Sequence, residues 1–73
     1  MITMSFAPHQ QRVIEEHKEL TTKLNSLQGF FQTPIFAALP EAERSRLRIQ
    51  EGFMVGYQAV LQERIEAFIA AAQ

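Results

Sequence analysis

The sequence predicts an all-α protein: an antiparallel hairpin of two helices, joined by a short helical turn and assembled as a homo-oligomer. A run of about 30 residues after Pro40 contains no further proline and consists mostly of residues that lose little side-chain freedom in a helix. A second helical pattern precedes it, beginning at Pro8. The connection between the two is short, and short connections place neighbouring helices antiparallel.

The N-terminal part is expected to consist of an arm, residues 1–7, and a first helix, residues 8–31. Pro8 suits a first helical turn, where its missing N–H would be unpaired in any case. Apolar residues then recur at the two inward positions of a heptad. These positions are held by Val13, Leu20 and Leu27, and by His17, Leu24 and Phe31.

The connection is expected to contain a short helix over residues 34–38. Thr33 is a good capping residue, and Pro34 follows it at the first helical position. Ile35, Phe36 and Leu39 are apolar, so we expect them to form a plug that closes this end of the hairpin.

The long helix, expected over residues 40–72, carries apolar side chains on two sides. The stripe expected to face the first helix contains Leu47, Met54, Leu61 and Phe68, with Gln50, Tyr57 and Arg64 at the interleaved heptad positions. The second stripe contains Ile49, Phe53, Gly56, Val60 and Ala67. A helix that packs against one partner needs one apolar stripe, about 100° wide. Because this chain supplies only one partner, the second stripe is expected to meet another copy.

Two glycines four residues apart support that interface. Gly52 and Gly56 each cost about 1 kcal/mol in a helix interior relative to alanine, a cost that is tolerated where another backbone approaches closely. The alternative is that both glycines are incidental. The predicted oligomer interface consists of Ile49, Gly52, Phe53, Gly56 and Val60.

Size and composition also favour assembly. The chain has 73 residues and no cysteine. A single core of this size rarely supplies more than about 3–5 kcal/mol, so small folds need a disulfide, a metal or oligomerisation. Two histidines and no aspartate make a structural metal site improbable. No cofactor or metal is therefore expected, and assembly remains.

Charge and hydropathy exclude several partners. The formal net charge is −1, which creates no global field to attract DNA, and the few basic residues are dispersed. No apolar run approaches the roughly 18 residues of a membrane span. The first residues lack the basic and apolar regions of a secretory signal, and a chain without cysteine is compatible with the cytoplasm.

No arrangement of residues predicts catalysis. The sequence shows no nucleophilic thiol, no glycine-rich phosphate loop and no serine–histidine–carboxylate pattern, so we expect no enzyme activity. His17 lies on the apolar seam of the first helix. It is interpreted as a core histidine with one hydrogen bond, or alternatively as a ligand-binding or oligomer-locking residue.

Two arginines are candidates for anion binding. In the predicted hairpin, Arg12 and Arg64 lie at about the same height near the termini, with His9 one turn away. Arg64 also occupies a seam position, where a guanidinium needs a partner. A guanidinium binds planar or phosphate-like anions through two parallel hydrogen bonds. An internal salt bridge and an external anion both remain open.

The chain resembles a family of small phage proteins related to a crAss-phage gene product, over nearly its whole length after Ala7. The resemblance rests on a spaced pattern of helical residues. These residues are His9-Gln10-Gln11-Arg12-Val13-Ile14-Glu15-Glu16, Glu19-Leu20, Lys23-Leu24, Phe30, Ile35-Phe36, Leu39, Glu43-Arg44, Leu47, Gln50, Met54, Tyr57, Leu61 and Glu63-Arg64-Ile65.

That family is similar in turn to the phage anti-CBASS sponges, and the resemblance implies their function. Such sponges assemble as hexamers and sequester cyclic di- and trinucleotide immune signals in the cytoplasm of the infected bacterium. Lys23 matches a lysine of their dinucleotide pocket, and Arg64 matches an arginine implicated in nucleotide binding. Their tyrosine near the start of the first helix is absent here, and Pro8 or His9 stands in its place.

The resemblance therefore implies a cyclic oligonucleotide ligand bound by Pro8, His9, Arg12, Lys23 and Arg64. The alternative function is an interaction protein of a phage or prophage. In that case the second apolar stripe of the long helix would bind a host protein.

Overall fold

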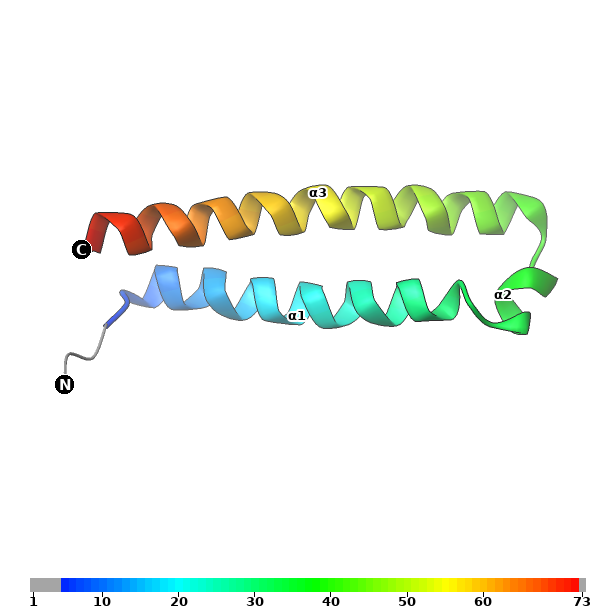
Figure 1. Cartoon of the computed structure of the whole chain (residues 1–73), viewed down its shortest axis with the longest axis horizontal. Helices are drawn as coiled ribbons and strands as arrows, with labels where there is room; N and C mark the ends of the chain where they lie inside the picture. The colour runs from blue at the N-terminus through cyan, green and yellow to red at the C-terminus, as the bar shows by residue number, and fades with distance from the viewer. Residues whose placement is uncertain (1–4, 73) are drawn as a thin grey trace.

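The computed structural model describes residues 5–72, which form three helices and no strand. Helix α1 spans Pro8–Phe30, α2 spans Pro34–Ala38 and α3 spans Glu41–Ala72. Helices α1 and α3 run antiparallel side by side, α2 lies in the connection, and the start of α1 and the end of α3 lie together at the opposite end (Figure 1). The result is a rod that measures 52 × 20 × 16 Å. Residues 1–4 of the expected N-terminal arm lie outside the described residues.

Short local hydrogen bonds fix the beginnings of two helices. At α1, the backbone N–H of Ala7 donates to Oε1 of Gln10, at 2.9 Å. At α2, the backbone N–H of Phe36 donates to Oγ1 of Thr33, at 3.3 Å, so Thr33 caps this helix as expected. Both contacts satisfy N–H groups that have no partner within the helix.

An aromatic cluster closes the α2 end of the hairpin. The buried Phe36 ring lies 5.9 Å from the ring of Phe30 and 4.8 Å from that of Phe31. The expected plug is wrong in one respect, because Ile35 is 67% exposed. Helix α2 has a single turn, so it can bury one face only, and Phe36 occupies that face.

The core is a narrow seam between α1 and α3. One cluster in it consists of the buried Val13, Leu20 and Leu61, with Met54, Ile65 and Phe68 partly buried against them, and Leu24 is buried one turn further along α1. Leu61 is completely enclosed. Few apolar side chains are removed from water in one copy, so the hairpin alone has little hydrophobic stabilisation.

The heptad prediction for α3 is wrong at three positions. Gln50, Tyr57 and Arg64 are exposed rather than on the seam. Ile65 packs there instead. The seven-residue repeat itself holds, because Met54, Leu61 and Phe68 all pack against the core. The second inward position lies four residues after these side chains, as at Gln58 and Ile65, and not three residues after them.

Two side-chain hydrogen bonds set the register of the hairpin. Nε2 of Gln58 donates to Oγ1 of Thr21 at 2.9 Å, and Nε2 of Gln28 donates to Oε2 of Glu51 at 3.0 Å. The two bonds are seven residues apart on each helix, in opposite chain directions, as an antiparallel pair requires. One further step places Ile14 opposite Ile65, and both side chains are half-buried.

Candidate functional site

The two long sides of the hairpin differ in their bonding. Thr21, Gln28, Glu51 and Gln58 lie on one side of the seam, which we call the clasped side. On each helix, the helical period places other residues on the opposite flank of the buried stripe. We call this flank the open side, and its members are Arg12, Glu16, Glu19 and Lys23 on α1 and Arg46, Gln50, Tyr57 and Arg64 on α3.

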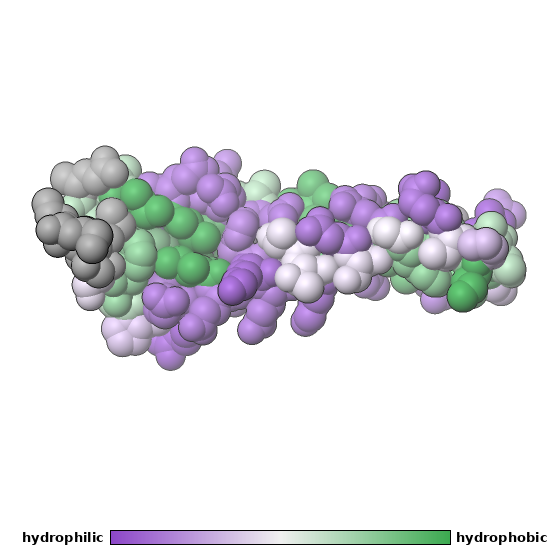
Figure 2. All heavy atoms as spheres, turned by 60° about the horizontal axis from the view of Figure 1, so that its bottom comes forward, coloured by the Kyte–Doolittle hydropathy of each residue, from purple (hydrophilic) through white to green (hydrophobic). Residues whose placement is uncertain are grey.

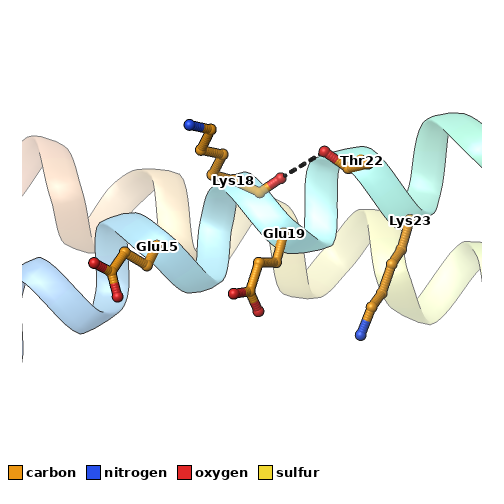
Figure 3. A pocket seen from close by; sticks show the side chains of 5 residues that line it. All are labelled: Glu15, Lys18, Glu19, Thr22 and Lys23. Carbon is orange, nitrogen blue, oxygen red and sulfur yellow. Dashed lines mark hydrogen bonds between the residues drawn. The ribbon is translucent and has the colours of Figure 1, made fainter.

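The open side of α1 carries two negative side chains between two positive ones. Arg12 and Lys23 bracket Glu16 and Glu19, and all four side chains are exposed. Figure 3 shows Glu19 and Lys23 pointing to the same side, while Lys18 points the opposite way. The glutamates would repel an anion in the middle of α1. An anion that approached this side would therefore be attracted more strongly by the cations of α3.

A shallow groove of about 470 Å³ runs along the outer surface of α1. Its lining consists of Glu15, Lys18, Glu19, Thr22 and Lys23. Oγ1 of Thr22 donates to the backbone oxygen of Lys18, at 3.1 Å (Figure 3). The groove has no aromatic or arginine side chain to hold a nucleotide. Its cations are Lys18 and Lys23, and Lys23 is the one predicted as a ligand residue.

The side chain of Arg64 is exposed to solvent and does not pack in the seam. Within residues 5–72, the one ion pair joins Arg46 to Glu43, with Nε of the arginine 3.0 Å from Oε1 of the glutamate. The internal salt bridge considered for Arg64 is therefore not formed in this part of the chain. Its guanidinium remains accessible to an anion from outside.

The candidate residues gather in two places. Phe6 packs edge-on against Phe68, with ring centres 5.6 Å apart, and holds the start of α1 against the end of α3. Arg64 lies one turn before Phe68, while Pro8, His9 and Arg12 are exposed on the first turns of α1. Lys23 is three turns beyond Arg12, or about 16 Å, and so does not share one contact cluster with the others.

Tyr57 is a residue that sequence reasoning assigned to the wrong place. It is 46% exposed and lies on the open side at the level of Lys23, because Gly56 is opposite Lys23 in the register set by the two hydrogen bonds. An exposed ring beside a lysine could cover a base next to a phosphate. A count of 3.6 residues per turn places Tyr57 and Ile65 at equal angles on either side of Leu61, so the sequence period alone could not decide which of them faces α1.

The second apolar stripe of α3 is exposed in this single copy. Ile49, Phe53 and Val60 are 59%, 76% and 52% exposed, and together with Tyr57 we call them the exposed stripe. A groove of about 510 Å³ lies along it, lined by Arg46, Ile49, Gln50, Phe53, Met54 and Tyr57. A stripe of this kind marks an interaction surface.

The predicted interface glycines are also uncovered. A Cβ atom added at Gly52 or Gly56 would meet nothing within 4 Å. Packing within one copy therefore does not explain why glycine occupies these positions.

The face formed by α1 is mainly polar (Figure 2). Figure 2 shows hydrophilic atoms along most of the face formed by α1, with hydrophobic atoms gathered toward the two ends of the rod.

His17 is half-buried on α1. Between residues 5 and 72, no three histidine, aspartate or glutamate side chains lie close enough to hold a metal ion. No helix in this range is both long and apolar enough to cross a membrane.

Fold and site together define a small helical hairpin with exposed cations on one side and an uncovered apolar stripe on its longer helix. The chain belongs to the Sequestin family, whose model matches residues 7–67. The matched span contains all of α1 and α2, the exposed stripe, and both Lys23 and Arg64. No curated protein and no solved structure matches the chain.

Proposed function

We propose that this protein is a phage counter-defence sponge. It binds cyclic di- or trinucleotide immune signals, or related nucleotides, in the cytoplasm of an infected bacterium and withholds them without chemical change. The observation that carries the proposal is the exposure of Arg12, Lys23, Arg64 and Tyr57 on one side of a hairpin whose family name, Sequestin, denotes sequestration.

The chemistry of these side chains suits such a ligand. A guanidinium donates two parallel hydrogen bonds to a phosphate, and a lysine adds a point charge. An exposed aromatic ring can stack on a base, which is worth about 1–3 kcal/mol per base. Arg12, Lys23 and Arg64 supply the cations, and Tyr57 supplies the ring, with His9 as a second flat side chain at the terminal end.

Assembly would turn open surfaces into pockets. A single hairpin offers only shallow grooves, in which a ligand keeps most of its hydration. Copies that meet through the exposed stripe, as a hexamer in the sponges that the sequence resembles, would wall these grooves and exclude water. Electrostatic contacts to phosphate strengthen when water is excluded.

Isothermal titration calorimetry against a panel of ligands tests the proposal. The panel contains 3′,3′-cyclic GMP–AMP, cyclic di-GMP, cyclic tri-AMP and the cyclic ADP-ribose isomers. We expect at least one to bind, and we expect Arg64→Ala and Lys23→Ala each to weaken binding by at least about 1–3 kcal/mol, because each removes charge-assisted hydrogen bonds. Lys18→Ala is the control for the loss of one lysine charge, because Lys18 also lines the groove on α1 but points away from Lys23 (Figure 3).

The exposed stripe also favours a second candidate, an interaction protein that binds a host protein through α3. The same experiment separates the two functions. If no member of the panel binds the wild-type chain, the sponge proposal is overturned. If a ligand binds with equal affinity to both variants, Arg64 and Lys23 are not part of the site.

A further inference from the structure

Two arginines bracket the exposed stripe of α3. Arg46 and Arg64 are each nine residues from Val55, and their separation of 18 positions makes five full helical turns. Both side chains therefore project from the same side of α3, which is the open side. They are separated by about 27 Å along the helix, so one copy cannot bring them to the same anion.

The occupant that best fits the stripe is α3 of a second copy. The stripe is apolar along its centre, and the bare backbone at Gly52 and Gly56 leaves room for another helix. Antiparallel packing aligns the two helix dipoles favourably. It also uses the same patch on both copies, as a two-fold interface requires.

We propose that two copies pack α3 against α3 in antiparallel fashion, about a two-fold axis near Val55, and so place Arg46 of one copy beside Arg64 of the other. This pair forms a shared anion site for a phosphate of the nucleotide. The inference rests on the proposed function for its ligand, and it adds Arg46 to the site as a residue that the partner copy contributes.

The state of Arg46 in one copy is compatible with this role. Among the described residues, 5–72, it pairs with Glu43, three residues before it, and the two side chains are 69% and 42% exposed. Exposed pairs of this kind contribute little to stability, so Arg46 can turn toward an interface at small cost. Gln50 and Tyr57 lie on the same flank, between the arginines.

An empty site would hold two guanidinium groups face to face. Like charges repel, and the repulsion grows as the interface excludes water. A bound phosphate replaces this repulsion with attraction, because each guanidinium can donate two hydrogen bonds to the phosphate oxygens. Ligand binding and pairing of the copies are therefore expected to reinforce each other.

Cysteine cross-linking tests the orientation, and the chain has no native cysteine to interfere. Antiparallel packing about Val55 places Ile49 of one copy level with Val60 of the other. An Ile49→Cys protein mixed with a tagged Val60→Cys protein should give mainly the mixed disulfide under mild oxidation. Gln62→Cys, exposed on another side of α3, is the control and should cross-link little. Mainly like-with-like disulfides at both positions, or cross-linking no better than the control, would overturn the pairing.

Complementation tests the shared site. Arg46→Ala and Arg64→Ala should each weaken binding of the tightest panel ligand by about tenfold to a hundredfold. When the two variants are co-refolded, every mixed pair holds one intact site and one that lacks both arginines. Titration should therefore recover a fraction of sites with wild-type affinity, whereas two arginines that act independently would give no recovery.

The outcomes separate this inference from the proposed function. A wild-type chain that binds no nucleotide but still forms the mixed disulfide refutes the ligand and keeps the pairing. A wild-type chain that binds, with Arg46→Ala unchanged or no recovery in the mixture, refutes the shared site and keeps the sponge.

Discussion

At the scale of single residues, the guanidinium of Arg48 packs on the aromatic cluster at the α2 end of the hairpin. The guanidinium carbon of Arg48 lies 4.8 Å from the ring centre of Phe31 and 5.2 Å from that of Phe36. Arg44 ties the same end to the connection, because its Nε donates to the backbone oxygen of Leu39 at 3.1 Å. Arg44 and Arg48 therefore help to hold α2 and the connection against α3.

Arg48→Ala is expected to lower the free energy of unfolding by about 1 kcal/mol, from the loss of two exposed cation–π contacts. Arg48→Lys should recover only part of it, since a lysine cannot stack as a plane on the rings. Urea unfolding at fixed protein concentration measures both. Arg12→Ala, on an exposed helix surface without a ring contact, is the control. Equal stability of Arg48→Ala and wild type would show that the stacking contributes nothing.

At the scale of the elements, the polar clasp decides how the two long helices align. The sequence could predict the three helices, because prolines, a threonine cap and heptad spacing are all local signals. It could not predict that Gln58 reaches Thr21 or that Gln28 reaches Glu51, because these contacts depend on the rotation of α3 about its own axis. The same rotation moved Tyr57 and Arg64 from the predicted seam to the surface.

The candidate site was accessible to sequence reasoning only in part. Arg12 and Arg64 could be placed at one end of the hairpin from loop length alone. Tyr57 and Arg46 could not be assigned to the open side, since that side exists only relative to the clasp.

The Thr21–Gln58 hydrogen bond is expected to couple the two helices. A double-mutant cycle with Thr21→Ala and Gln58→Ala should give an interaction free energy of about 0.5–1.5 kcal/mol, the usual net contribution of a partly buried hydrogen bond. The matched control cycle uses Thr22→Ala and Gln62→Ala, two exposed positions with no mutual bond. Additive effects at Thr21 and Gln58 would mean that the bond does not set the register.

At the scale of the whole molecule, the rod is short of buried surface. Within residues 5–72, five apolar side chains are buried and only Leu61 is completely enclosed, while a large aromatic ring, Phe53, is left 76% exposed. A chain with no cysteine has no disulfide to compensate. Assembly through the exposed stripe would stabilise the hairpin and create walls for a ligand in one step.

Substitutions at Gly56 are expected to affect the stability of the hairpin and its assembly differently. Because a Cβ atom there meets nothing within 4 Å, Gly56→Ala should raise helix stability in a single copy by up to about 1 kcal/mol. Gly56→Leu should instead disrupt assembly while circular dichroism shows that helicity is kept. Gln62→Leu, at an exposed position away from the stripe, is the control for added apolar bulk. Intact oligomers of Gly56→Leu would exclude a close backbone contact at this position.

The mass of the wild-type protein in solution tests the central claim most directly. Multi-angle light scattering over a range of concentrations compares it with the 8.4 kDa of one chain. We expect a stable multiple of that mass, because the stripe formed by Ile49, Phe53, Tyr57 and Val60 must be covered. A mass of one chain at every concentration would contradict the account and remove the shared pockets with it.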